Sequence, residues 1–372
     1  MQHSGHLVGA AAYPWGVPDA VTPRSENNST PAASPGGTTR DTADLPPLSG
    51  LLDQVREEPS LARMLEIHQR GDLDVDLTAV PGVRPWAAAV IARELEPTGG
   101  VVLVATATGR EAEDLAASLR SLLPPQSVAV FPSWETLPHE RLSPRSDTVG
   151  QRLAVLRRLA HPGQTDHDGP LRVVVSAVRS LLQPLPTGLG DLVPVSVQAG
   201  ETRDPEELIE ALVAAAYTRT DLVEKRGEFA VRGGIVDVFP PTEDHPLRVE
   251  FWGDEVEEVR WFRVADQRSL EIAPGGLWAP PCRELLLTEQ VQERAAGLAE
   301  ELPGVADMLA SIAAGVAVEG MESLTPVLVD GMETLLDVLP DGSRLLVSDP
   351  ERLRRRAADL VSTSQEFLTA GW

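Results

Sequence analysis

The residues of this sequence that could take part in catalysis gather in one proline-punctuated segment. His139 stands next to Glu140 and four residues after Glu135 in "SWETLPHERLSP". A histidine beside carboxylates is typical of general acid–base catalysis, because the imidazole titrates near neutral pH. The segment has no serine elbow, no cysteine and no second histidine, so a loop with partly buried side chains is the favoured interpretation. A small nucleotidase or hydrolase that uses His139 stays an alternative.

The chain has a single lysine, Lys225, which limits the phosphate chemistry open to it. A phosphate-binding loop of the Gly-Lys-Ser/Thr type needs a lysine that reaches the β- and γ-phosphates of a nucleotide. Lys225 lies in "DLVEKRGEF" without a glycine-rich loop before it. The stretch "AVPGVRPWAAAVIA" (79–92), where such a loop is expected, contains no lysine. The sequence therefore predicts no ATP site of this type and no bound cofactor.

Metal ligands do not occur at the spacing that a metal site needs. The single cysteine, Cys282, excludes a cysteine-based zinc site and an internal disulfide. His161 and His167 lack metal-ligand spacing, and the acidic run "GDEVEEV" (253–259) alternates its carboxylates between the two faces of a predicted hairpin. We therefore expect no metal site and a solvated hairpin.

Two arginines suggest binding rather than catalysis. Arg219 is expected at the end of a helix, and Arg232 on the solvent face of a strand together with Glu228 and Ala230, opposite a buried Phe229. A guanidinium group offers five donors in a planar fork that fits a carboxylate across an interface. Exposed arginines are more often solvated charges, so both interpretations stay open from the residues alone.

Charge and composition restrict the partners. The chain of 372 residues has a formal net charge of −24, which repels nucleic-acid backbones. Its densest basic run, "RLRRRAADL" (352–360), is typical of a solvated helix face. A basic protein is therefore a more plausible partner than DNA. No apolar run reaches membrane-spanning length, and with one cysteine a cytoplasmic location is expected.

The elements that must position these residues begin with an α/β domain. Continuous β-branched runs such as "LRVVVSAV" (171–178) predict buried strands, and amphipathic helices lie between them, as in a parallel sheet. A short strand is expected at "DVDLTAV" (74–80), one helix over 51–71, and a helix from 146 that is capped by Ser146 or Asp147.

The pattern changes to a period of two at about residue 190. Asp204-Pro205 opens a helix as its N-cap and first residue. A tight turn or bulge at Gly233-Gly234 and a hairpin at Gly253-Asp254 join alternating runs. The predicted organisation is a disordered tail over 1–47, an α/β parallel-sheet domain over 48–189, an inserted α+β domain with an antiparallel sheet over 190–282, and a mostly helical part with a late strand, "SRLLVSD", over 283–372.

Two stretches resemble a known family. They are "FPSWETLPHERLSPRSDTVGQRLAVLRRL" (131–159) and "RGEFAVRGGIVDVFPPTEDHPLRVEFWGDEVEEVRWFRVADQRSLE" (226–271). Both closely resemble the N-terminal region of the bacterial transcription-repair coupling factors (Mfd), a region that is itself similar to the damage-recognition protein UvrB. The resemblance extends over about residues 48–372. It implies a degenerate RecA-like parallel-sheet domain that has lost its ATPase motifs, with an inserted domain that binds UvrA.

The resemblance also accounts for the missing lysine. In UvrB the phosphate loop lies at the segment that matches residues 79–92. Here Val83, Arg84 and Pro85 occupy the region of Gly-Lys-Thr. Pro85 has no backbone N–H to offer a phosphate. The loop is therefore expected to be vestigial.

Site residues and partners are implied in the same way. The UvrA-contacting segment of UvrB aligns with "YTRTDLVEKRGEFAVRGG" (217–234), so that Arg219 and Arg232 match contact arginines while Ala230 replaces a third. The implied function is a non-catalytic adaptor that recruits UvrA to RNA polymerase stalled at a DNA lesion, in transcription-coupled nucleotide excision repair. RNA-polymerase binding and an ATP- and Mg²⁺-dependent DNA translocase are expected in a further part of a longer parent protein. A purely structural or autoinhibitory role in that parent is the alternative.

Overall fold

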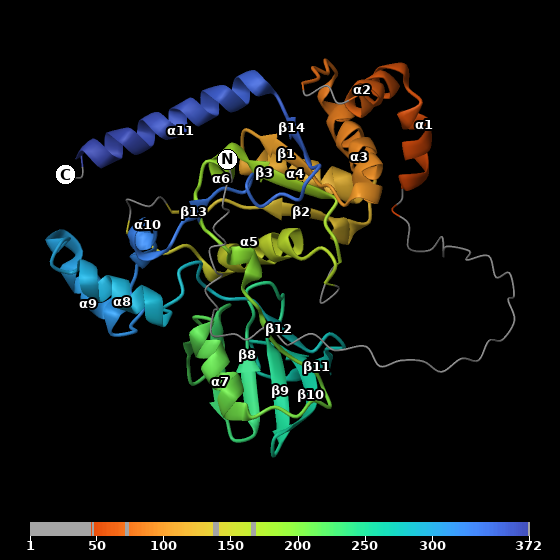
Figure 1. Ribbon diagram of the computed structural model, residues 1–372. Coiled ribbons are helices and arrows are strands. Elements are labelled where there is room, and N and C mark those ends of the chain that lie inside the picture. Colours follow the sequence, from red (N-terminus) through yellow and green to blue (C-terminus); the bar gives the residue numbers. More distant parts are fainter. Residues whose placement is uncertain (1–45, 47, 71–73, 137–140, 165–168, 371–372) are drawn as a thin grey trace, which may run out of the picture. The chain divides into compact units, whose positions relative to one another are not determined.

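Figure 1 shows the computed structural model of the chain, which describes residues 46, 48–70, 74–136, 141–164 and 169–370. The predicted disordered tail lies outside these residues except for residue 46, and so do His139, Glu140 and His167. In the part of the chain that is described, no helix is both long and apolar enough to cross a lipid bilayer.

A four-stranded parallel sheet forms the centre of the α/β part, in the order β14-β1-β3-β2. Val102 pairs with Arg344 of β14 on one side and with Val173 of β3 on the other. The strands β1 and β3 are buried along their whole length, as expected for β-branched runs covered on both faces. The predicted buried strand at 171–178 is therefore confirmed. The bounds are β1 Val102–Thr106, β2 Val128–Phe131, β3 Val173–Ala177 and β14 Arg344–Val347.

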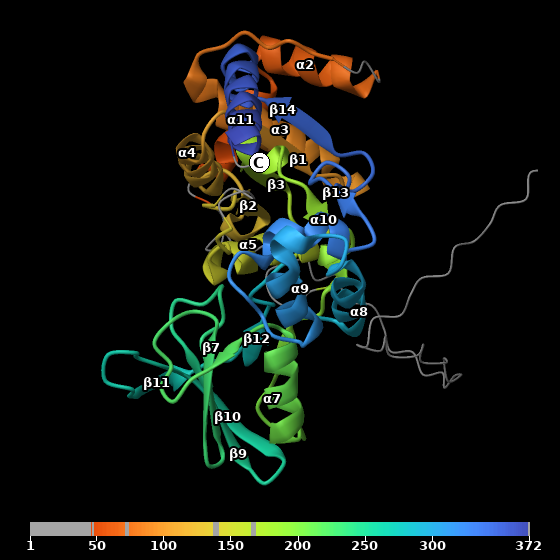
Figure 2. The ribbon, with the colours of Figure 1, turned by 90° about the vertical axis from the view of Figure 1, so that its left-hand side faces the viewer.

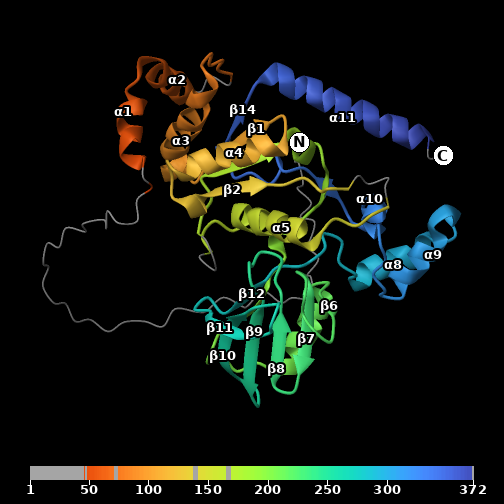
Figure 3. The same ribbon diagram turned by 180° about the vertical axis from the view of Figure 1, so that it is seen from behind.

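Helices cover the two faces of this sheet (Figures 1 and 3). Residues of α1 to α4 pack with Val102 and Val104 on one face, and residues of α5 pack with Leu103 and Val174 on the other. This arrangement confirms the predicted α/β fold with helices between parallel strands. The bounds are α1 Leu52–Arg56, α2 Pro59–Gln69, α3 Arg84–Leu95, α4 Gly109–Arg120, α5 Ser146–Ala160 and α6 Val178–Leu181.

Two expectations near the start of this part are wrong. The predicted single helix over 51–71 is broken at Pro59, where the Glu58 carboxylate accepts hydrogen bonds from the backbone N–H groups of Ser60 and Leu61 and so caps α2. Residues 74–80 form no strand. No strand in the described part of the chain pairs with these residues, although their polar and apolar side chains alternate.

The predicted cap of α5 is also wrong. The N-cap position is Arg145, which makes no side-chain capping bond. The Ser146 hydroxyl instead donates to the backbone oxygen of Arg226, 2.9 Å away. The side chain of Asp147 forms an ion pair with Arg145. Ser146 therefore ties α5 to the region of the second sheet, which sequence periodicity does not reveal.

The second sheet has six strands in the order β11-β10-β9-β8-β7-β6, and Figure 2 shows α7 beside it. All neighbouring strands are antiparallel except β6 and β7, which are parallel. At Gly233-Gly234 the tight turn is what forms, and the hairpin at Gly253-Asp254 is confirmed. The bounds are β6 Thr218–Arg219, β7 Glu228–Arg232, β8 Ile235–Val238, β9 Leu247–Trp252, β10 Glu255–Phe262 and β11 Ser269–Ile272, with the separate pair β5 Val195–Val197 and β12 Leu277–Ala279.

The helix α7 (Pro205–Ala214) begins as predicted but ends earlier. Asp204 caps it by accepting from the backbone N–H of Glu206, 2.9 Å away. Ala216 then takes a left-handed conformation with φ 63°, which ends the helix. The prediction that Arg219 ends this helix is wrong, because Arg219 lies on the edge strand β6.

The part after residue 283 is mostly helical, as predicted, and supplies β14 to the parallel sheet. A small apolar core joins α8, α9 and α10. The bounds are α8 Glu289–Leu298, α9 Ala306–Ala313, α10 Thr325–Leu328 and α11 Pro350–Ala370. A further strand pair joins β13 (Met332–Glu333) of this part to β4 (Leu185–Pro186). Short 3₁₀ helices occur along the chain at Ser49–Leu51, Pro81–Val83, Glu96–Thr98, Pro125–Ser127, Leu189–Asp191, Pro303–Val305 and Met321–Leu324.

A close approach between α5 and the loop after β8 gives a first testable prediction. A Cβ atom at Gly150 would lie 2.3 Å from the Cβ of Pro241. Gly150→Ala is therefore expected to lower the free energy of unfolding by about 1–3 kcal/mol, because the overpacked contact outweighs the gain in helix propensity. Urea denaturation measures the change. Gly297→Ala in α8 is the matched control, since nothing lies within 4 Å of its Cβ position. Equal unfolding midpoints for the two variants would contradict this account.

Candidate binding surface

Arg219 and Arg232 line the same surface hollow. The hollow has a volume of ≈ 450 Å³, and its other lining residues are Thr220, Asp221 and Val231. Arg219 is exposed on β6, and the side chain of Arg232 at the end of β7 is 44% exposed. The structure therefore brings together the two arginines that the sequence singled out, although they are 13 positions apart.

Backbone pairing fixes the strand that carries Arg219. Thr218 donates to the Gly227 oxygen (2.8 Å) and Thr220 to the Phe229 oxygen (2.9 Å), so the short edge strand is held at both ends. Phe229 itself is fully buried in the core between the sheet and α7, as predicted. The hydroxyl of Thr220 donates to Leu222, 3.1 Å away, which closes the turn after Arg219. The position of Arg219 thus depends on the backbone pairing of β6 with β7, which carries the buried Phe229, and not on contacts of the Arg219 side chain.

The hairpin between β7 and β8 places a buried carboxylate beneath Arg232. Arg232 pairs with Ile235 across the two-residue turn, whose first residue, Gly233, has φ 61°. Two residues beyond Ile235, on the same strand face, lies Asp237, which is 1% exposed. Arg232 donates a hydrogen bond to Asp237 through Nη2.

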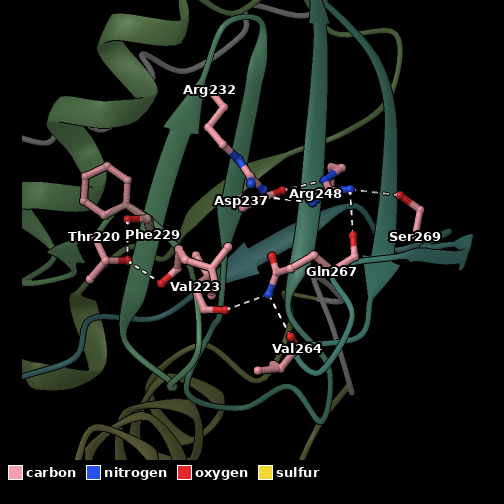
Figure 4. Close-up of polar contacts among 10 residues, drawn as sticks. Thr220, Val223, Phe229, Arg232, Asp237, Arg248, Val264, Gln267 and Ser269 are labelled. Atoms are coloured by element: carbon pink, nitrogen blue, oxygen red, sulfur yellow. Dashed lines mark hydrogen bonds and ion pairs between the residues drawn. The ribbon is translucent and has the colours of Figure 1, made fainter.

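Asp237 has a second cationic partner, Arg248 (Figure 4). The Nε of Arg248 donates to Oδ1 of Asp237 at 2.7 Å, and its Nη2 donates to Oδ2 at 2.9 Å. The guanidinium of Arg248 also stacks on the ring of Phe262, 4.7 Å from the centroid. The hydrogen bond with Asp237 raises the pKa of Arg248 above its ordinary value, in opposition to desolvation by burial. Arg248 alone thus holds Asp237 through both carboxylate oxygens.

This arrangement leaves positive charge at the surface. One buried carboxylate lies between two guanidinium groups, so the cluster of Arg232, Asp237 and Arg248 carries a net charge of about +1. Because Arg248 makes the bidentate contact, Arg232 keeps donors free to reach an outside group. Within the described residues Arg219 forms no salt bridge. The hollow is therefore suited to a carboxylate, although Asp221 also lines it.

Gln267 links this cluster to the turn behind Arg219 (Figure 4). Its backbone oxygen accepts from Arg248 Nη1 at 3.3 Å. Its side-chain amide donates to the backbone oxygens of Val264 (2.9 Å) and Val223 (3.3 Å). Sequence reasoning missed Asp237, Arg248 and Gln267. The available signal was Asp237 itself, a carboxylate within the apolar run "GIVDVF", because a buried charge requires a partner.

Ala230 does not lie on a solvent face as predicted. It is 1% exposed and packs in a small second core with Val223, Phe239 and Phe262. It pairs directly with Asp237 across the ladder. The position that the resemblance assigns to a third arginine is thus part of a packed interior, and the cations at Asp237 come from Arg232 and Arg248.

The catalytic alternative gains no support from its described members. Glu135 accepts a hydrogen bond from the hydroxyl of Thr148 in α5 and so contributes to packing. His161 lies 2.9 Å from a carboxylate oxygen of Asp191, and among the described residues no group of three potential metal ligands occurs. Burial raises the pKa of the Cys282 thiol well above its ordinary value, so it stays protonated and unreactive at neutral pH.

The segment that carries the predicted motif 131–159 contributes a buried ion pair. Arg152 of α5 is fully buried and pairs with Glu284, which is 1% exposed. Glu284 also accepts from the indole Nε1 of Trp134 (3.1 Å), and Arg152 donates to the backbone oxygen of Pro132 (2.8 Å). The guanidinium lies 4.4 Å from the ring centroid of Phe131. These contacts give the motif a structural role, since they join the end of β2 and α5 to the residues that follow β12.

Comparisons with known proteins agree with this architecture. Residues 195–274 match the family model of the UvrB interaction domain. The transcription-repair-coupling factor of Mycobacterium tuberculosis is 49% identical over 349 residues, which are 91% of this chain and 28% of that protein. The factor of Bacillus subtilis is 33% identical over 186 residues, 50% of this chain and 15% of that protein. UvrABC system protein B of Gloeobacter violaceus is 31% identical over 227 residues, 57% of this chain and 32% of that protein.

The mycobacterial relative matches most of this chain, whereas the family model matches one segment of it. The chain spans 28% of the length of the mycobacterial relative, and the UvrB interaction domain lies within its second, mostly antiparallel part. That part contains both arginines of the hollow. The chain is therefore related to the transcription-repair-coupling factors along 91% of its length and carries their UvrB-like module, which confirms the family that its two motif-bearing stretches predicted.

Proposed function

We propose that this chain is a non-catalytic adaptor that binds UvrA, and that residues 190–282 form its UvrA-binding domain. The observation that carries the proposal is the hollow that Arg219 and Arg232 share. A partner carboxylate in this hollow would meet two guanidinium groups, one of which is already oriented by Asp237. Charge-assisted contacts of this kind are stronger and more directional than neutral ones.

The relatives suggest where such an adaptor acts. Their names associate them with the coupling of transcription to repair and with the UvrABC system. We propose that the chain brings UvrA to RNA polymerase stalled at a DNA lesion, in the cytoplasm. In a parent coupling factor, contacts with RNA polymerase and DNA and the use of ATP with Mg²⁺ would belong to the part of the protein that this chain does not span.

A capture experiment tests the proposal. Immobilised chain is expected to retain purified UvrA, and Arg232→Ala is expected to retain about 10–30-fold less at limiting concentration, because truncation of an arginine anchor typically costs about 2 kcal/mol. Addition of ATP with Mg²⁺ to the chain alone is expected to leave its thermal midpoint unchanged. Equal capture by wild type and variant would reject the site, and a nucleotide-dependent shift with turnover would favour the hydrolase alternative.

A further inference from the structure

Trp252 is the most exposed large apolar side chain among the described residues, at 79%. It ends β9 and precedes the turn Gly253-Asp254. Leaving an indole ring in water forgoes roughly 2–3 kcal/mol of burial free energy. Tryptophan and arginine are also the residue types that dominate binding hot spots.

The strand register places Trp252 on the same face as Arg232. Along β9, Val249 points into the core, so Arg248, Glu250 and Trp252 alternate to the opposite face. Ile235 of β8 pairs with both Arg232 of β7 and Glu250 of β9, so these three residues form one row across the sheet. Trp252 lies two residues beyond Glu250 in the same strand. The strand of Arg232, β7, and the strand of Trp252, β9, are therefore two strand spacings apart, or about 10 Å. This separation lies well within one protein interface.

The hairpin that carries Trp252 is fixed from behind. Phe251 donates to the Gly234 oxygen at 2.8 Å, which joins the two turns at this end of the sheet. Arg203 donates to the Asp254 oxygen at 2.7 Å, and Val256 donates to the Glu201 oxygen at 2.9 Å. These bonds hold the tip without covering the indole, so little ordering entropy is lost when a partner binds.

The charges along this face have two signs. Arg232 makes one end of this face cationic, and Arg219 lines the hollow beside it from the edge strand β6. Glu250 and the exposed Asp254 and Glu255 surround Trp252 with carboxylates. A complementary surface must therefore present a carboxylate and, about 10–15 Å away, an apolar pocket with a basic rim.

We propose that Trp252 is an aromatic anchor of the UvrA-binding face and inserts into such a basic-rimmed apolar pocket of UvrA. This inference rests on the proposed function and extends its surface from the arginine hollow across β8 to the β9–β10 hairpin. The hollow supplies charge recognition, and Trp252 supplies the buried apolar area that two arginines lack.

Affinity measurements on the full chain with purified UvrA test the inference. Trp252→Ala is expected to weaken binding at least about 10-fold, with Trp252→Phe intermediate, because a phenyl ring retains part of the apolar area. Ile272→Ala is the matched control: it truncates an apolar side chain that is 54% exposed on β11, at the far edge of the same sheet, and is expected to bind as wild type. At high salt the loss in Trp252→Ala is expected to persist, whereas the loss in Arg232→Ala shrinks.

The outcomes separate the two proposals. Wild-type affinity of Trp252→Ala beside impaired Arg232→Ala would overturn the anchor and leave the adaptor function standing. Wild-type affinity of both variants would overturn both proposals. Equal losses in Trp252→Ala and Ile272→Ala would overturn the anchor as well, because Ile272 lies at the far edge of the sheet and the effect would not be specific to Trp252.

Discussion

The double charge reversal Arg219→Glu/Arg232→Glu is expected to lower the affinity for UvrA by more than about 100-fold, or about 2.7 kcal/mol. Both side chains line one hollow, so the variant replaces two positive charges in this hollow with two negative ones. The loss of two charge-assisted contacts adds to the repulsion of a partner carboxylate. Calorimetric titration with purified UvrA measures the dissociation constant. The sheet is expected to stay folded, because Arg248 still holds Asp237 through both oxygens.

Net charge alone must be excluded as the cause. Two Arg→Glu replacements lower the formal charge by 4, from −24 to −28. Arg263→Glu/Arg268→Glu makes the same change in the turn after β10, where both side chains are exposed and pair weakly with Asp266. This control is expected to bind within about twofold of wild type. A comparable loss in the control would show that the effect is non-specific and would remove the support for the hollow.

Glu284→Gln is expected to lower the free energy of unfolding by about 3–5 kcal/mol. The amide has nearly the shape of the carboxylate but no charge, so the fully buried Arg152 loses its compensation. Two atoms of the pair, Arg152 Nη2 and Glu284 Oε2, already lack hydrogen-bond partners among the described residues, and the other acceptors of Arg152, the oxygens of Pro132 and Gln183, carry no charge. Denaturant unfolding followed by circular dichroism measures the change.

An exposed pair provides the comparison for this buried one. Glu351→Gln removes a carboxylate from the pair with Arg354, whose side chains are 82% and 71% exposed, and is expected to change stability by less than about 1 kcal/mol. The double variant Arg152→Leu/Glu284→Leu is expected to be more stable than either single charge deletion, because neither charge is then left alone. If Glu284→Gln unfolds at the wild-type midpoint, the buried pair does not stabilise the contact of β2 and α5 with the residues that follow β12.

Local patterns predicted much of the fold because their causes are local. The β-branched run that contains Val173–Ala177 forms a buried strand wherever it is covered on both faces. Asp204 caps α7 through an atom two residues away. The same reasoning failed for residues 74–80, because alternation specifies which side chains share a face and not whether the segment pairs with another strand.

The candidate site was predictable only in part. The resemblance assigned Arg219 and Arg232, but periodicity placed Arg219 at a helix end, and the left-handed turn at Ala216 places it on β6 instead. Asp237 and Arg248 were missed because their ion pair joins residues 11 positions apart through the ladder of β8 and β9. Such partners follow from strand register, which no single segment encodes.

The sequence by itself determined the residue inventory and the family of this protein. The chain has one lysine, Lys225, and its two motif-bearing stretches indicated the relatives that it matches. Only the tertiary structure decided which side chains meet. The shared hollow of Arg219 and Arg232, the carboxylate of Asp237 beneath it and the pairing of Arg152 with Glu284 all depend on contacts between distant segments. Local propensity acts over a few residues, whereas these contacts form only once strand pairing and core packing have brought the segments together.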